Sequence, residues 1–225
     1  MRLRLLLVAA LALVAVNMAF ADIPQLNLQV GANPVTNVVG SGNSASYNNT
    51  NFFGWNLMVV FGNSNSPGLV PYGLDITSLS AACVGGGSCG TLTIDLSDTG
   101  FTTASPSFRT FYSSTQTGGA ASTTQTAWDD PNNLMFGTTN LIGTVGPITG
   151  AGGSGTASGG GPEVGGATHP YSLTIQDVFT GCSGENCVSY STDGNITGVP
   201  EPAAVVLFGS VLALCASKFR RRRAA

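Results

Sequence analysis

The sequence predicts an all-β fold, an antiparallel β-sandwich or jelly roll, between residues 22 and 198. Three segments, 26–30, 92–96 and 171–175, alternate apolar and polar side chains with a period of two residues. Such alternation is typical of strands that bury one face. No helical periodicity of useful length occurs between residues 22 and 198, and Gly- or Asn-rich turns divide this part into short strands.

Four further segments favour the same fold. Residues 52–61 are more continuously apolar, which predicts one strand covered on both faces, and 107–112, 122–128 and 187–191 combine Thr, Ser and aromatic side chains. Turns separate the strands, and we expect them at 64–68, 98–100, 129–133 and 193–195, where Asp, Asn, Pro and Gly gather.

Residues 150–166 read GAGGSGTASGGGPEVGG. This low-complexity segment carries too little apolar surface to hold a fixed shape, which predicts a long mobile loop. A linker between two domains is the alternative. The loop is favoured because too little chain follows the segment to form a second core.

Charge is distributed unevenly along the chain. Between Asp22 and Val199 ten acidic residues face a single base, Arg109, which gives this part a formal charge of −9, against −3 for all 225 residues. An acidic domain repels phosphate backbones, so nucleic acid is excluded as a partner. The Thr-, Ser- and Gly-rich, Lys-poor composition is common in exported β-proteins.

The N-terminus has the features of a secretory signal peptide over residues 1–21. Arg2 and Arg4 form a positive segment, an apolar run follows, and Ala19 and Ala21 match the A-x-A cleavage pattern. A retained membrane anchor is the alternative. The run is short for a membrane span, which needs about 20 apolar residues, so cleavage before Asp22 is favoured.

The C-terminal segment, 199–225, has the opposite order. Residues 203–216 are apolar apart from Gly209 and Ser210, and basic residues follow at once. A helix of this length is short for a bilayer about 30 Å thick, and a positive cluster stays on the cytoplasmic side. The sequence predicts a short transmembrane helix that holds the chain transiently in the inner membrane. An ordinary tail anchor is the alternative.

This tail resembles the PEP-CTERM sorting signal. The resemblance rests on three features in a fixed order: a Pro-Glu-Pro motif, the apolar segment after it and a final arginine cluster. The motif with its preceding residue comprises Val199, Pro200, Glu201 and Pro202, and the cluster comprises Arg220, Arg221, Arg222 and Arg223. It implies that exosortase, a membrane-embedded cysteine transpeptidase or protease, recognises and processes the tail. The stretches LTIDLSDTGFT, WDDPNNLMFGT and PYSLTIQDVF also resemble an uncharacterised branch of PEP-CTERM ectodomains, which implies no activity.

Four cysteines precede the tail, namely Cys83, Cys89, Cys182 and Cys187. An even number in an exported chain indicates disulfides. Three pairings are possible, and the short loops favour 83–89 and 182–187. A zinc site is the alternative, but the first spacing exceeds the usual C-x2-C to C-x4-C range, so no metal is expected.

Catalytic patterns are weak. Asp98-Thr99-Gly100 matches the D-T-G of aspartic proteases, but no second copy is present to form the carboxylate pair, so a turn is favoured. His169 is the single histidine and is expected in an exposed loop. A paired-carboxylate glycosidase stays open in principle, although no pair stands out. The chain is expected not to be an enzyme and to need no cofactor.

Two binding patterns also have plain structural explanations. The oxygen-rich segments 129–133 and 193–195 could contribute calcium ligands, but simple Asx turns are favoured. A set of aromatic residues could form a sugar-stacking platform, although core positions are favoured in a small sandwich. This set comprises Phe52, Phe53, Trp55, Phe111, Tyr112 and Trp128.

Together these features predict an exported protein of the cell surface or extracellular matrix, with a structural or adhesive role. Exosortase is the expected processing partner, and exopolysaccharide is an expected contact. A carbohydrate-binding module is the alternative function, and a secreted hydrolase is a weaker one.

Overall fold

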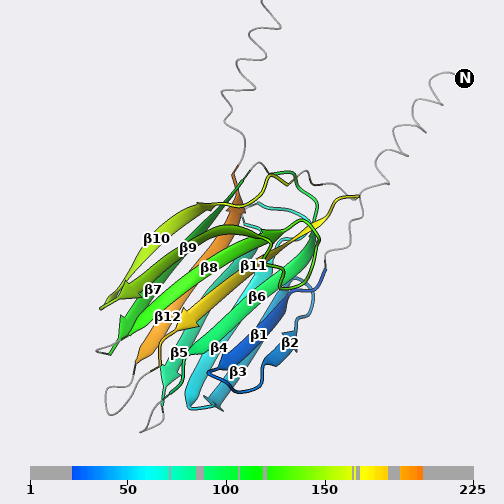
Figure 1. Ribbon diagram of the computed structural model, residues 1–225. Helices are drawn as coiled ribbons and strands as arrows, with labels where there is room; N and C mark the ends of the chain where they lie inside the picture. Colours follow the sequence, from blue (N-terminus) through cyan, green and yellow to red (C-terminus); the bar gives the residue numbers. More distant parts are fainter. Residues whose placement is uncertain are drawn as a thin grey trace, which may run out of the picture.

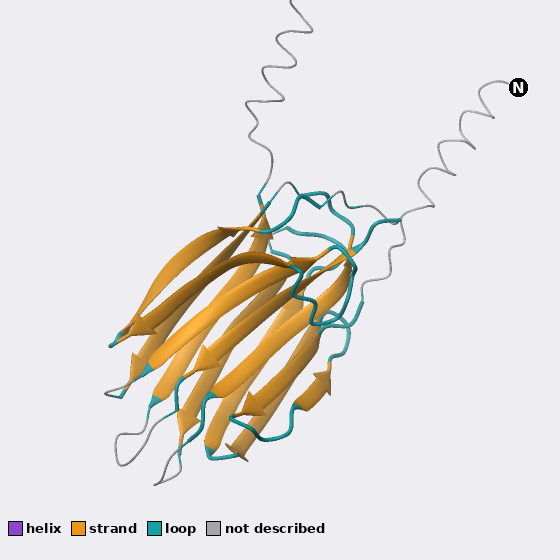
Figure 2. Cartoon of the chain, in the orientation of Figure 1, coloured by secondary structure: helices purple, strands orange, loops and turns teal. Residues whose placement is uncertain are grey.

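The computed structural model describes residues 22–70, 72–84, 89–105, 107–118, 121–163, 165, 168–181 and 188–199. In these ranges every regular element is a strand (Figures 1 and 2). The strands are β1 (Gln25–Val30), β2 (Thr36–Val39), β3 (Ser44–Phe52), β4 (Trp55–Ser64), β5 (Leu74–Cys83), β6 (Leu92–Phe101), β7 (Phe108–Thr117), β8 (Ser122–Asp130), β9 (Asn140–Thr149), β10 (Gly152–Gly159), β11 (Tyr171–Phe179) and β12 (Ser189–Gly198).

The strands form two six-stranded sheets. Sheet A has the order β2-β1-β6-β11-β8-β9 and sheet B the order β10-β7-β12-β5-β4-β3, with every neighbouring pair antiparallel. Figure 1 shows the sheets as two stacked layers. The predicted all-β antiparallel sandwich is therefore confirmed.

The expected signal helix over 1–21 and the expected membrane helix within 199–225 lie outside the described residues. Among the residues that are described, none belongs to a helix with the length and apolar character of a membrane span.

The chain passes from one sheet to the other at both edges of the sandwich. β2, at one edge of sheet A, is followed by β3, the edge strand of sheet B. At the opposite edge β9 of sheet A is followed by β10 of sheet B, and these two strands lie in close contact. Each exposed edge of one sheet thus lies beside an edge strand of the other.

The core lies between the sheets and is built by alternation. In β1 and β6 the residues at every second position are fully or almost fully buried, and Leu28 lies opposite Ile94 in the register. Burying such a side chain contributes about 1.5–3 kcal/mol. The largest fully buried side chains come from both sheets and are Trp55, Tyr112, Tyr171, Phe101, Phe108 and Phe179.

Five of the seven predicted strands are confirmed, namely 26–30, 92–96, 107–112, 122–128 and 171–175. The predicted strand over 52–61 is confirmed in part: β4 contains 55–61, but a hairpin turn separates it from Phe52, and Met58 is exposed, so the strand is not covered on both faces. Phe53 and Gly54 both have positive φ (49° and 89°), so they form a two-residue turn in which Phe52 pairs with Trp55. Positive φ at both central positions is the geometry that matches the twist of paired strands.

The prediction for 187–191 is confirmed in part, since β12 covers Ser189–Gly198 and Cys187 lies outside the described residues. The turn expected at 193–195 is wrong, because these residues continue β12. The register against β5 shifts between Thr192 and Gly194, where β5 contributes one residue more than β12, so the bulge lies on β5 and β12 pairs regularly with β7.

The loop expected over 150–166 is also wrong for Gly152–Gly159, which form β10. β10 pairs with β7 over its whole length, from Gly152 opposite Thr115 to Gly159 opposite Phe108. Its small residues alternate in a strand-like way. One face carries Gly153, Gly155, Ala157 and Gly159, and the other carries Ser154, Thr156 and Ser158.

The small residues of β10 allow a close approach to β9. A Cβ on Gly155 would lie 2.8 Å from the Val145 side chain, and a Cβ on Gly143 would lie 2.4 Å from the Cβ of Ala157. Both distances are too short for a side chain without movement of the neighbouring strand. The low-complexity composition is therefore a packing requirement at this edge of the sandwich.

We expect Gly143→Ala to lower the free energy of unfolding by about 1–3 kcal/mol, because the added methyl overpacks the contact with Ala157. Urea unfolding followed by circular dichroism measures this change. Gly153→Ala, whose added Cβ would lie 3.5 Å from the Ile148 side chain, is the matched control and should stay within about 0.5 kcal/mol of wild type. A Gly143→Ala variant as stable as the control would contradict the proposed packing.

Candidate functional site

The residues of the predicted sorting signal lie at or beyond the end of the described chain. Val199 closes it, with its amide donating to the carbonyl of Ser107 at 2.9 Å. The other predicted sorting and cleavage residues lie outside the described residues, namely Pro200, Glu201, Pro202, Arg220, Arg221, Arg222, Arg223, Ala19 and Ala21. Atomic contacts can therefore define a candidate binding or catalytic site only within the sandwich.

The predicted disulfide between Cys83 and Cys89 is confirmed, with Cα atoms 6.0 Å apart. It joins the end of β5 to the segment that enters β6. The Trp55 indole donates to the carbonyl of Gly90 at 3.0 Å, which holds the same segment against the core. Cys182 and Cys187 lie outside the described residues, so their pairing stays a prediction.

Asp98-Thr99-Gly100 forms neither a protease site nor the expected turn. The three residues lie within β6, where the register against β11 shifts between Tyr171 and Leu173, so they form a bulge. Asp98 accepts a hydrogen bond from the Thr99 amide at 2.8 Å, and Gly100 has φ of +77°. Both features were expected of a turn and suit a bulge equally.

Two carboxyl groups do meet, but in a buried position. Asp129, at the end of β8, is fully buried and accepts hydrogen bonds from Asn140 Nδ2 at 2.8 Å and from the Gly161 amide at 3.0 Å. Burial, a hydrogen bond with Asp129 and nearby negative charge raise the pKa of Glu163 to about 7.

The raised pKa lets Glu163 keep its proton near neutral pH beside Asp129. A glycosidase instead needs two carboxyl groups separated by about 5–9.5 Å on either side of a substrate. The Asp129–Glu163 pair is suited to holding the β10–β11 connection against β8, rather than to that chemistry.

The segment 129–133 forms the predicted Asx turn. Asp130 Oδ1 accepts hydrogen bonds from the Asn132 amide at 2.8 Å, from Asn132 Nδ2 at 2.9 Å and from the Thr139 hydroxyl at 2.9 Å. Local donors thus occupy the oxygen that a calcium ion would need. Within the described ranges, no group of three or more His, Cys, Asp or Glu residues is placed to hold a metal.

His169 lies in an exposed loop, as predicted, and its Nδ1 lies 2.9 Å from the hydroxyl of Thr168. The six aromatic residues do not form one platform. Phe52, Trp55 and Tyr112 are buried in the core, which confirms the prediction for these three. Phe53 is 48% exposed at the β3–β4 turn. Phe111 of β7 and Trp128 of β8 are half-buried, on different sheets.

A polar connection crosses the core between the sheets. The Thr110 hydroxyl of β7 donates to Gln125 Oε1 of β8 at 2.8 Å, and Gln125 Nε2 donates to Asp177 Oδ1 of β11 at 3.0 Å. All three residues are fully buried. Burial raises the pKa of Asp177 to about 7, and the negative charges of Asp95 and Asp193 act in the same direction.

This connection also explains Gly194. A Cβ on Gly194 would lie 1.9 Å from Gln125 Nε2, so a larger residue would displace the amide that joins the sheets. The sequence 193–195 therefore contains glycine for packing reasons, and not because the chain turns there.

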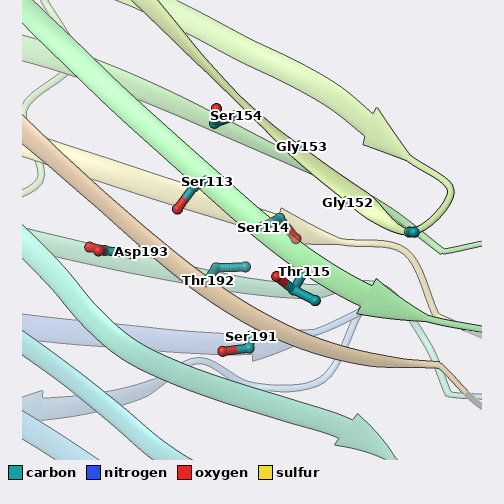
Figure 3. Close-up of a pocket in the computed structure, with 10 residues that line it drawn as sticks. Ser113, Ser114, Thr115, Gly152, Gly153, Ser154, Ser191, Thr192 and Asp193 are labelled. Atoms are coloured by element: carbon teal, nitrogen blue, oxygen red, sulfur yellow. The ribbon is translucent and has the colours of Figure 1, made fainter.

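The outer face of sheet B carries a shallow hollow of about 560 Å³ over β10, β7 and β12 (Figure 3). We call it the hydroxyl trough and define it by Ser113, Thr115, Ser154, Ser191 and Asp193, with Gly152 and Gly153 at its edge. Two rows cross the strands. Ser154, Ser113 and Asp193 form one row, and Gly152, Thr115 and Ser191 form the other.

The outer face of sheet A carries a second polar set, which we call the amide row. It crosses all six strands in register and consists of Asn37, Asn27, Asp95, Gln176, Thr126 and Thr144. Its members bond to one another. Asn37 donates to Asn27 at 2.9 Å, Gln176 donates to Asp95 at 2.9 Å, and the hydroxyls of Thr126 and Thr144 lie 3.2 Å apart.

Sequence reasoning missed both surfaces. Each arises from residues that lie far apart in the chain and come together only through strand register. The alternation of Ser154, Thr156 and Ser158 was the one local signal for the trough, and the surrounding glycines concealed it.

No known family model and no curated protein matches the sequence. Several solved structures show a distant likeness. A carbohydrate-binding module, TmCBM61, solved with β-1,4-galactotriose, is 9% identical with a TM-score of 0.31, over 54% of this chain and 71% of its own.

Two bacterial adhesin domains give similar values. The Epf adhesin domain of Streptococcus pyogenes is 9% identical with a TM-score of 0.35, over 80% of this chain and 60% of its own. The K1 cleaved adhesin domain of Lys-gingipain from Porphyromonas gingivalis is 16% identical with a TM-score of 0.32, over 71% of this chain and all of its own. These scores are too low to bear on function.

The pKa of Asp177 leads to a testable dependence of stability on pH. Asp177 keeps its proton in the folded chain up to about pH 7, but the unfolded chain loses it near pH 4. The folded state therefore binds more protons between these values, and its stability is highest in mild acid and falls as pH rises. Wild type should lose about 3 kcal/mol more between pH 5 and pH 8 than Asp177→Asn does.

Urea unfolding across that pH range measures the difference. Asp193→Asn, which neutralises an exposed carboxylate, is the control and should keep most of the wild-type slope. If Asp177→Asn followed the wild-type profile, Asp177 would have to be ionised in the folded protein at pH 5.

Proposed function

We propose that this protein is an exported β-sandwich of the cell surface or extracellular matrix, with a structural or adhesive role and no catalytic activity. It is delivered through a PEP-CTERM-type tail. The signal peptide over 1–21 starts export, the tail holds the chain in the inner membrane, and exosortase processes it at or near Pro200-Glu201-Pro202.

The Cys83–Cys89 disulfide is the observation that carries the proposal. Disulfides persist in oxidising compartments and are rare in the cytosol, so the bond supports export. It closes a short loop at one end of the sandwich, where it restrains the chain between β5 and β6. This placement favours a structural bond over a redox-active one.

The chemistry of the carboxyl groups supports a role without catalysis. The buried Asp129 and Glu163 share a hydrogen bond, and Asp177 serves to join the sheets. The D-T-G residues are part of a bulge in β6. The outer faces of the two sheets carry polar side chains, and such faces are suited to contact with another polymer.

The order of the features in the tail supports sorting: the Pro-Glu-Pro motif comes first, then the apolar run, then the arginine cluster. Pro200 and Pro202 disfavour helix and keep the chain extended, so the peptide bonds near Glu201 would be accessible at the membrane surface. The apolar run after them is followed by Arg220–Arg223, which resist transfer across the membrane.

Intact mass spectrometry of the protein from its native host tests this function. We expect a chain that begins at Asp22 and ends near Pro200 to Pro202, and that gains about 2 Da on reduction for each disulfide. The same measurement in a strain lacking exosortase should yield a chain that keeps its tail.

A mature chain that carries Arg220–Arg223 in both strains would contradict sorting and indicate a simple tail anchor. A mass unchanged by reduction would contradict the disulfide and, with it, the main support for export.

A further inference from the structure

We propose that the hydroxyl trough on sheet B is the adhesive surface and that it binds an uncharged polysaccharide. This inference deepens the proposed adhesive role and rests on it, because it names the class of polymer that the exported domain contacts.

The first argument is the free hydrogen-bonding capacity of the trough. Ser113, Ser154, Ser191, Thr115 and Asp193 are half-buried or exposed, and among the described residues none of their side chains hydrogen-bonds to another protein group. A hydroxyl both donates and accepts, and a carboxylate accepts at two oxygens. Such a surface matches the hydroxyl groups of a sugar chain, which also donate and accept.

The second argument is spacing. The rows Ser154–Ser113–Asp193 and Gly152–Thr115–Ser191 cross three neighbouring strands. Adjacent strands lie about 4.8 Å apart and residues i and i+2 about 7 Å apart. The trough therefore presents polar groups at regular intervals in two directions. A polymer with repeated hydroxyl groups can meet several of them at once.

The third argument is a neighbouring aromatic ring. Phe111 precedes Ser113 by two residues on β7, so its side chain projects from the same face of sheet B. It is half-buried and pairs across the strands with Thr156 and Asn195. An aromatic face beside hydroxyl groups suits a sugar ring, which has apolar C–H faces and a polar rim.

Charge selects the class of sugar polymer. The trough contains a carboxylate, Asp193, and no base, so it repels uronate, sulfate and phosphate groups. Arg109 is the one Lys or Arg residue among the described ranges. It lies beyond Phe111 on β7, four residues from Ser113, and contacts the Thr156 hydroxyl at 3.4 Å. Thr156 lies two residues from Ser154 on β10, about 7 Å along the strand, so the guanidinium lies beside the trough while Asp193 lies within it.

The amide row on sheet A is the competing surface, and its own hydrogen bonds argue against it. Asn37 is bonded to Asn27, Gln176 to Asp95, and Thr126 contacts Thr144. A ligand there would have to break these bonds before forming new ones. The trough requires no such exchange.

The test is affinity electrophoresis of the full chain, purified in mild detergent, through gels that contain one polymer each. The neutral polymers are a β-glucan, a galactan and a mannan; alginate is the anionic polymer and chitosan the cationic one. We expect at least one neutral polymer to slow migration, by an amount that changes little with salt. Isothermal titration with oligosaccharides of that polymer then gives the affinity.

Two variants locate the site. Asp193→Ala should weaken binding about fivefold, because it removes hydrogen bonds at an exposed position that does not affect folding. Phe111→Ala should weaken it about tenfold through loss of the ring contact, with urea unfolding as a check on stability. Asn37→Ala and Trp128→Ala, on the outer face of sheet A, are the matched controls and should bind like wild type.

Three outcomes would overturn the proposal: retardation by alginate or chitosan alone, no retardation by any polymer, or full binding by both trough variants. Loss of binding in Trp128→Ala alone would also overturn it and would assign the ligand to sheet A. These outcomes are independent of the mass measurement in the native host, so export and sorting can hold while glycan binding fails, and the reverse.

Discussion

The hydrogen bonds from Thr110 through Gln125 to Asp177 are the interaction on which the arrangement of the two sheets depends. They cross the core between the sheets, and a buried polar group without its partner would cost about 1–3 kcal/mol. The position of the Gln125 amide requires a glycine at 194, and because side chains alternate along β12, the inward position of Gly194 leaves Asp193 exposed on the outer face of sheet B. A contact in the core thus determines which carboxylate reaches the surface where we propose that a polymer binds.

A second constraint is the near absence of positive charge. The described chain holds nine carboxyl groups and one guanidinium group, so amides, hydroxyls and other carboxyls must take the place of ion pairs. Asn140 and the Gly161 amide donate hydrogen bonds to Asp129, Gln125 donates one to Asp177, and Glu163 forms a hydrogen bond with Asp129. Burial raises the pKa values of Asp75 and Asp98 to about 6 as well. The result is a domain that takes up protons on folding and is most stable in mild acid.

Sequence patterns predicted the parts of the fold in which one face of a strand is apolar and the other polar, as in 26–30 and 92–96. They failed where a position is determined by a partner that lies far away in the chain. Asp193-Gly194-Asn195 and Asp98-Thr99-Gly100 have turn composition, but the first continues β12 and the second forms a bulge within β6, because the neighbouring strands continue past them. The strands β2, β3, β5 and β9 were not predicted, and β10 was predicted to be part of a loop. The two polar surfaces could not be predicted either, since register alone brings their residues together.

β10 shows how one low-complexity segment meets two requirements at the same edge of the sandwich. Its inward positions must be small because β9 passes close by, as the contact between Gly143 and Ala157 shows. Gly152 has φ of +123°, and a Cβ there would lie 2.1 Å from the carbonyl oxygen of Ser114, so no larger residue fits at the start of the strand. The same absence of side chains leaves the edge of the trough open beside Ser113 and Ser154. Bulky residues in β10 would therefore both separate the sheets and close the trough. Packing in the interior and access to the surface thus favour the same composition in this strand.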